Sequence, residues 1–196
     1  RLRGERFPAR RRPSLLALHA SSYHTSNTMQ LWGALKERLG DACALEEIGL
    51  RNGAVSDCSG CPYTACLHFG EKGRCFYGGL MQEEVWPAVR RCDAVMMLCP
   101  NYNDALSANL TAFINRMTGL FRQTRFYDKA LFAVIVSGYS GGDIVARQVL
   151  DAILAAGIPP LDAIERQSQY STPMQGLAAA MRKDDYPDFS PAYCGA

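Results

Sequence analysis

Three short apolar runs, each followed by a polar loop and then a longer amphipathic segment, constrain the fold of this chain most. The runs are Ser14–Ala20, Ala94–Cys99 and Leu131–Ser137. Continuous apolar runs of this length are typical of strands that are buried on both faces of a parallel sheet. The alternation of such strands with helices predicts an α/β fold with a doubly wound parallel sheet.

Apolar residues at helical spacing predict the helices of this fold. They are Asn27–Gly40, Glu83–Arg91 with Pro87 inside it, Ser107–Arg125 with Ser107 as its N-cap, and Asp143–Ala156. A weaker alternating run, Ala42–Leu50, is expected at a sheet edge, and a last strand is expected around Leu161–Arg166. The prediction is therefore a parallel sheet of five strands, for which 2-1-3-4-5 is one of the common doubly wound strand orders.

The composition is that of an ordinary soluble domain. The chain has 196 residues, 48% of them hydrophobic and 20% charged, which suits one domain with a full core. Its longest uninterrupted apolar run, Ala130–Val136, is too short to span a membrane, and no secretory segment is recognised. We therefore expect a cytoplasmic protein without a membrane partner.

Most of the positive charge lies at the N-terminus. Residues 1–13 contain six Arg and one Glu, a local charge of +5 in a chain of net +2, so the remainder carries −3. We expect residues 1–13 to be a solvated basic leader, residues 14–170 to form the domain and residues 171–196 to be a tail. Because no basic surface is expected on the domain, nucleic acid is not an expected partner.

The loop after the first run is rich in short polar side chains. Of the nine residues Ala20–Thr28, six carry a hydroxyl or a carboxamide on a short side chain. They precede a helix, whose free N–H groups and dipole favour an anion. The loop lacks the glycines of a P-loop or of a dinucleotide fingerprint. It predicts a phosphate site on Ser21, Ser26, Asn27 and Thr28, the alternative being an ordinary helix cap.

Two further loops follow the other apolar runs. Pro100, Asn101, Tyr102 and Asn103 follow the second run, and Ser137, Gly138 and Tyr139 end or follow the third. Glycine allows the backbone to pass close to a planar ligand, and tyrosine can cover a ring. Since parallel strands present their carboxyl ends at one edge of the sheet, we expect the three loops to form one ligand site.

Two of these loops resemble those of the NADPH-dependent FMN reductase family, and the resemblance extends over residues 14–166. The second loop matches the family pattern at Pro100, Tyr102, Ser107, Leu110, Phe113 and Arg116. The first loop matches at Ser21, Asn27 and Thr28, but Ala20 and Ser22 stand where the family has Gly and Pro. Asp104 also takes a place that is often Gly in the family.

The resemblance implies a flavodoxin-like fold that binds FMN through the residues of the three loops. It further implies an oxidoreductase that passes electrons from NAD(P)H through FMN to an unidentified small-molecule or protein acceptor. The flavin would carry the chemistry, so no catalytic acid or base is expected. Relatives suggest a homodimer or homotetramer. The alternative function is a non-enzymatic electron carrier of the flavodoxin or iron–sulfur flavoprotein type.

Four of the eight cysteines, Cys58, Cys61, Cys66 and Cys75, fall in a Gly-rich segment, residues 55–79, after the second strand. Four thiolates on a short segment suit a [4Fe–4S] cluster or a tetrahedral Zn site. The position resembles that of the cysteines in iron–sulfur flavoproteins, where the spacing is more compact. A cluster, Zn and metal-free redox thiols stay open, with His68 expected to be a loop residue rather than a ligand.

Overall fold

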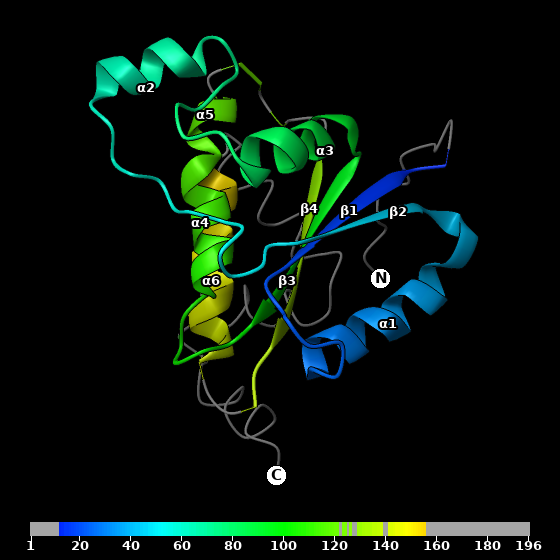
Figure 1. The fold of residues 1–196 in the computed structure, drawn as a ribbon. Helices are drawn as coiled ribbons and strands as arrows, with labels where there is room; N and C mark the ends of the chain where they lie inside the picture. The colour runs from blue at the N-terminus through cyan, green and yellow to red at the C-terminus, as the bar shows by residue number, and fades with distance from the viewer. Residues whose placement is uncertain (1–11, 122, 125, 127–128, 139–140, 156–196) are drawn as a thin grey trace.

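In the part of the chain that the structure describes, four parallel strands form the sheet (Figure 1). The computed structural model describes residues 12–121, 123–124, 126, 129–138 and 141–155. The strands are β1 (Ser14–His19), β2 (Ala44–Gly49), β3 (Ala94–Pro100) and β4 (Ala130–Val136), in the order β2-β1-β3-β4. This order confirms the first four positions of the predicted topology. The predicted fifth strand, Leu161–Arg166, and the predicted tail lie outside the described residues.

The strand register brings three carboxyl ends to one edge of the sheet. Strand β1 pairs with β2 from Ser14↔Ala44 to His19↔Gly49, and with β3 from Leu15↔Ala94 to His19↔Leu98. Strand β3 pairs with β4 from Ala94↔Ala130 to Pro100↔Val136. The loops that follow β1, β3 and β4 therefore begin side by side, as predicted from the sequence.

Helices cover both faces of the sheet, which confirms the doubly wound arrangement (Figure 1). On one face, α1 (Asn27–Leu39), followed by the short η1 (Gly40–Ala42), packs Met29 and Trp32 against Leu15, Ala17 and Leu98. On the other face, α3 (Trp86–Arg91), α4 (Ala108–Arg116) and α6 (Gly142–Ala155) bury a larger cluster. No helix among the described residues is long and apolar enough to cross a membrane.

Two predicted helices differ from those in the structure. The predicted helix Ser107–Arg125 is divided into α4 and α5 (Thr118–Phe121) by a turn at Met117. Gly119 lies so close to Trp86 that an added Cβ would be 2.7 Å from the indole ring. The helix predicted from Glu83 begins earlier, with a π-helical turn η2 (Met81–Val85), and Pro87 lies in the first turn of α3, where a missing N–H does no harm.

The cysteine-containing segment includes a helix that the sequence did not predict. Helix α2 (Tyr63–Gly70) packs on α5, but Gly70 is its only fully buried residue. Because this helix has no buried apolar face, its sequence lacks the helical periodicity from which helices are predicted. His68 lies on this exposed helix, with its Nε2 2.9 Å from Lys72 Nζ. The expectation of a loop at His68 was therefore wrong.

Candidate functional site

The loop after β1 leads directly into the N-terminus of α1. Ser26 is the N-cap, with extended dihedral angles, and its Oγ accepts a hydrogen bond of 3.3 Å from the Met29 N–H. Asn27 and Thr28 form the first turn, the former exposed and the latter buried. Ser21 is buried, and its Oγ has no hydrogen-bond partner among the described residues. This buried hydroxyl is therefore left without a partner beside Ala20 and Ser22, which line the cavity described below.

The loop after β3 is a tight turn. Tyr102 and Ala105 exchange two backbone hydrogen bonds of 3.1 and 3.3 Å, and the two residues between them have left-handed backbone angles. The φ values are +53° at Asn103 and +58° at Asp104, in the left-handed region that Asn and Asp adopt more readily than other residues with a side chain. Tyr102 is exposed beside this turn, whereas Pro100 is buried at the end of β3.

The loop after β4 is joined to the loop after β3. Asn101 Nδ2 donates a hydrogen bond of 2.9 Å to Ser137 Oγ. The position of a Cβ on Gly138 has no atom within 4 Å, so the backbone there is open to a ligand. Gly141, with φ +86°, lies directly against the Asp104 side chain. Tyr139 lies outside the described residues, so its predicted place in the site stays a prediction.

A polar cavity of about 350 Å³ lies at this edge of the sheet. Its lining residues come from the loops after β1, β2 and β3 and from the start of α4: Ala20, Ser22, Tyr23, Asn52, Tyr102, Ser107, Ala108 and Asn109. Its volume falls in the range of small-molecule and cofactor sites. The loop after β2 therefore joins two of the three loops predicted from the sequence.

Ser107 is the N-cap residue of α4, but its side chain makes no capping hydrogen bond. The predicted N-cap position is therefore confirmed, but the hydroxyl does not make the hydrogen bond expected of a capping serine. Ser107 is only 7% exposed, and its Oγ has no partner among the described residues. A second buried hydroxyl is thus free for a ligand, at the wall of the polar cavity.

Asn109 holds that wall in place, and sequence reasoning did not identify it. Its Nδ2 donates to the Leu50 carbonyl at 2.6 Å and to Asn52 Oδ1 at 2.9 Å, joining α4 to the loop after β2. The position of Asn52 after a parallel strand was a usable signal, because ligands bind at such ends. Asn109 lies inside a helix, and nothing in the local sequence distinguishes it from a surface residue.

Residues 13–172 match the NADPH-dependent FMN reductase family. The chain belongs to this family. It is therefore an oxidoreductase of the NADPH-dependent FMN reductase type, and the resemblance seen in the sequence is confirmed. No curated protein matches the chain in sequence.

Solved structures show the same fold in other members of this structural class. An azoreductase from Bacillus anthracis strain Sterne has 11% identity and a TM-score of 0.55, over 86% of this chain and 98% of that chain. An FMN-dependent NADH-azoreductase from Bacillus anthracis strain Ames Ancestor, in complex with FMN, has 12% identity and a TM-score of 0.53, over 85% and 98%. RosB with bound 8-demethyl-8-formylriboflavin-5'-phosphate has 17% identity and a TM-score of 0.54. The match covers 75% of this chain and 61% of the RosB chain, so this chain spans less than two thirds of the length of RosB.

The residues of this FMN reductase relative fit a flavin phosphate at the start of α1. The buried, unpartnered hydroxyl of Ser21 is a hydrogen-bond donor, and the first turn of α1 offers backbone N–H groups and the positive end of the helix dipole. A neutral loop of this kind binds a phosphate through hydrogen bonds rather than through Lys or Arg. Ser21 and Thr28 are buried, so these contacts would be shielded from water.

A polar network lies behind the loop after β1. Glu47 on β2 accepts hydrogen bonds from Trp32 Nε1 at 2.7 Å and from Lys36 Nζ at 3.0 Å, and its Oε1 is 3.4 Å from His19 Nε2. Burial lowers the pKa of His19 below its usual value, and the Glu47 carboxylate only partly offsets this. Burial raises the pKa of Glu47, but the hydrogen bonds from Trp32 and Lys36 outweigh it, so that pKa lies below its usual value.

The four clustered cysteines line a second cavity, of about 380 Å³, at the opposite end of α4. Arg116 holds this segment to α4, since its guanidinium donates to the carbonyls of Gly78 at 2.7 Å and Ser56 at 3.4 Å. Within the described part of the chain, no three His, Cys, Asp or Glu side chains are arranged to hold a metal ion. The four thiols line the same cavity, but they are not arranged as the ligands of a metal centre, so the [4Fe–4S] expectation is not supported by the described residues.

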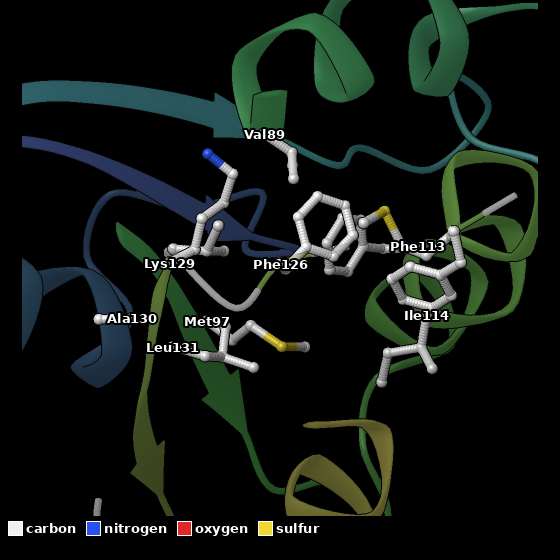
Figure 2. Close-up of a pocket in the computed structure, with 11 residues that line it drawn as sticks. Val89, Met97, Phe113, Ile114, Phe126, Lys129, Ala130 and Leu131 are labelled. Atoms are coloured by element: carbon white, nitrogen blue, oxygen red, sulfur yellow. The ribbon is translucent and has the colours of Figure 1, made fainter. Parts of the chain in front are cut away.

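An apolar cavity of about 70 Å³ lies near the amino ends of β3 and β4, away from the ligand edge (Figure 2). Phe113, Phe126 and Met97 are among its lining side chains. The Lys129 ammonium donates to the carbonyls of Cys92 and Arg90, at the C-terminal end of α3, so only its methylene groups line the cavity. This space is too small for a flavin and is a packing defect of the core.

Proposed function

We propose that this protein is an FMN-dependent NAD(P)H oxidoreductase that passes electrons from a nicotinamide nucleotide through FMN to an acceptor. The observation that carries the proposal is a polar cavity at the carboxyl edge of the sheet, lined by the buried, unpartnered hydroxyl of Ser107 and by Ala20 and Ser22, the two neighbours of Ser21. Family membership supplies the reaction class.

Each loop has a distinct part in this proposal. Ser21, Ser26, Asn27 and Thr28 would bind the phosphate at the N-terminus of α1. Pro100, Asn101, Tyr102 and Asn103 would lie against the ribityl chain and one side of the ring, and Ser137, Gly138 and Tyr139 against the other. The hydrogen bond between Asn101 and Ser137 would keep the last two loops at a constant separation.

FMN, when bound, supplies the redox chemistry, accepting a hydride from the nicotinamide and returning electrons to the acceptor. The protein contributes binding, orientation and exclusion of water. The thiols of Cys58, Cys61, Cys66 and Cys75 take no part in the proposed reaction, and their metal content stays a prediction for iron, sulfide and zinc analysis. A homodimer or homotetramer likewise stays a prediction, to be checked by light scattering.

Anaerobic titration of FMN-loaded protein with NADPH and with NADH tests the function. We expect loss of the visible absorption of the oxidised flavin with one equivalent of a nicotinamide nucleotide, and its return when an acceptor is added. A flavin that stays oxidised with either nucleotide but is bleached by dithionite would instead indicate an electron carrier. Protein that binds no FMN would contradict the proposal as a whole.

The residues are tested by comparing FMN with riboflavin, which lacks the phosphate. A hydrogen bond to a charged group contributes about 1.5–3 kcal/mol, so S21A is expected to weaken FMN binding roughly 10- to 100-fold. Riboflavin affinity should be unchanged in this variant. S56A is the matched control, because the Ser56 side chain is exposed and outside the polar cavity. Equal losses for both flavins would assign Ser21 to another part of the cofactor.

A further inference from the structure

His19 is a buried titratable group that immediately precedes the candidate phosphate loop in the chain, and the proposed reaction does not use it. It is the last residue of β1, is 6% exposed, and precedes the buried Ser21 by two positions. Side chains alternate along β1, with Leu15 and Ala17 facing α1 and Leu16 and Leu18 facing the other layer. His19 therefore lies on the α1 face, at the end of the strand where α1 begins.

The close fit of the imidazole is visible in its neighbour on β2. Gly49 pairs with His19 in the strand register, and a Cβ on Gly49 would lie 3.2 Å from His19 Cε1 and 3.3 Å from Nε2. The ring therefore lies over a glycine backbone. His19 Nδ1 is buried and has no hydrogen-bond partner among the described residues.

The charged groups around His19 do not hold it in the protonated form. Glu47, on β2, approaches Nε2 and favours the proton, but it also accepts hydrogen bonds from Trp32 and Lys36 of α1. The Ser21 backbone, close to the ring, also favours the proton, whereas Arg51, in the loop after β2, disfavours it, and desolvation disfavours it most. The imidazole is therefore neutral at neutral pH as long as no further anion is near.

The phosphate loop itself contains no Lys or Arg between Ala20 and Thr28, although a flavin phosphate is close to a dianion at neutral pH. The loop contains one histidine, His24, which is exposed. Solvent and salt screen an exposed imidazole, whereas a buried one responds strongly to a nearby charge.

We propose that His19 takes up a proton when the phosphate of FMN binds at the N-terminus of α1, and so supplies the positive charge that the loop lacks. The inference rests on the proposed function and makes His19 a positioning residue for the cofactor. Two consequences follow from linkage. FMN binding becomes tighter as the pH falls, and the preference for FMN over riboflavin depends on His19.

Isothermal titration calorimetry of the FMN-free protein at pH 7 tests this without any activity measurement. Titrations with FMN and with riboflavin are run in two buffers of different ionisation enthalpy, neither of them phosphate. We expect proton uptake with FMN and none with riboflavin. FMN affinity should rise between pH 8 and pH 6.5 by up to tenfold per pH unit, which is the limit for one linked proton.

Two variants identify the group that is protonated. H19Q should lose the proton uptake and most of the pH dependence, and its FMN affinity at pH 6.5 should fall about tenfold, while riboflavin binding is kept. H24Q is the matched control and should behave like the wild type. Any proton taken up by the phosphate of FMN itself would be the same in the wild type, H19Q and H24Q. The difference in proton uptake between these proteins therefore reports the protein groups alone.

The outcomes separate this inference from the proposed function. If neither flavin binds, the proposed function fails. If FMN binds without His19-dependent proton uptake, or if H24Q alone abolishes the uptake, only the inference about His19 is overturned. Should H19Q not fold, the histidine Cε1–H resonances of the wild type decide the matter, with H24Q and H68Q assigning two of the three. The remaining resonance must then shift toward the protonated form on FMN binding and not on riboflavin binding.

Discussion

At the scale of single residues, a substitution at Asn27 can distinguish the stability of α1 from the ability of this helix to bind an anion. Asn27 is the first residue of α1 and is exposed, and the first turn of this helix contains no acidic residue. A carboxylate there interacts favourably with the helix dipole but repels a bound phosphate. The same substitution should therefore affect folding and binding in opposite directions.

We predict that N27D raises the free energy of unfolding by about 0.3–1 kcal/mol and weakens FMN binding at least tenfold. Thermal unfolding of the FMN-free protein and calorimetric titration with FMN measure the two effects, with riboflavin as the control. A variant that is stabilised but binds FMN like the wild type would show that no phosphate lies at this helix start.

Cys99 and Cys92 are residues of the core. They are 0% and 3% exposed, and burial raises the pKa of Cys99 to about 12 and raises that of Cys92 as well. Both thus stay protonated thiols at neutral pH and are poor nucleophiles. Burial confirms that they pack as small apolar groups, as the apolar run around Cys99 suggested.

C99A is expected to lower the free energy of unfolding by about 1–2 kcal/mol, because it leaves a small cavity in the core. NADPH oxidation per bound flavin should be unchanged in this variant and in C92A. Urea unfolding and stopped-flow reduction of the flavin measure the two quantities. Loss of turnover in flavin-loaded C99A would reveal a redox role that its burial argues against.

At the scale of elements, the turn after β3 and the start of α6 depend on each other. Asp104 has left-handed backbone angles, and its side chain lies where a Cβ on Gly141 would be. Gly141 itself has φ +86°, which a residue with a side chain adopts only at a cost. The two loops on either side of the proposed flavin ring are therefore placed by one contact.

We predict that G141A lowers the free energy of unfolding by about 2–3 kcal/mol, through backbone strain and through collision with Asp104. D104G should restore part of this loss in the double variant, because it removes the collision but leaves the strain. A double-mutant cycle in urea measures the coupling. Additive effects of the two substitutions would contradict the contact.

Arg116 connects α4 to both ends of the cysteine segment. It is 5% exposed, and its guanidinium donates to carbonyls on residues 56 and 78. The neighbouring Asn115 donates to Asp57, and Asn109 to Leu50, so the chain from β2 to the cysteines runs alongside α4 (Figure 1). One helix thus supports both the polar cavity and the thiol-lined cavity.

Removal of this guanidinium leaves two carbonyls without their donor. We expect R116M to lower the free energy of unfolding by about 2–3 kcal/mol and to expose residues 50–79 to limited proteolysis. K72M, a substitution at an exposed cation of the same segment, is the control and should change neither measurement. An R116M protein with wild-type proteolysis would show that the segment is held by its other contacts.

At the scale of the whole molecule, stability depends on pH through the network of His19 and Glu47. The folded protein holds the pKa of His19 below its unfolded value of 6.5, so the unfolded chain binds more protons as the pH falls. The contribution of His19 to the free energy of unfolding is therefore fully present above pH 6.5 and is lost as the pH falls toward its folded pKa. The contribution of Glu47, whose pKa lies below 4.5, is lost only at still lower pH.

We predict that the FMN-free protein is less stable at pH 5.5 than at pH 7.5, and that H19Q reduces this difference. Each unit by which folding lowers the pKa of His19 corresponds to about 1.4 kcal/mol. Urea unfolding at the two pH values measures the difference, with H24Q as the control. An unchanged pH dependence in H19Q would mean that other groups dominate the acid sensitivity.

The sequence by itself determined the four described strands, the convergence of their loops and the family. The strands and their loops depend on short-range signals: continuous apolar runs, helical spacing, and the rule that parallel strands end at one edge. The strand order followed from the resemblance of the loop motifs to the family, because no local pattern reports which strands are neighbours.

Only the tertiary structure decided the free hydroxyl of Ser107, the contacts of Gly119, Asn109 and Arg116, and the surroundings of His19. The contacts depend on partners far away in the chain: Trp86 for Gly119, Leu50 for Asn109, Gly78 for Arg116 and Glu47 for His19. A local pattern cannot report such a partner. The sequence therefore predicted which loops meet, whereas the packing of distant segments decided which side chains in them are buried, paired or left available to a ligand.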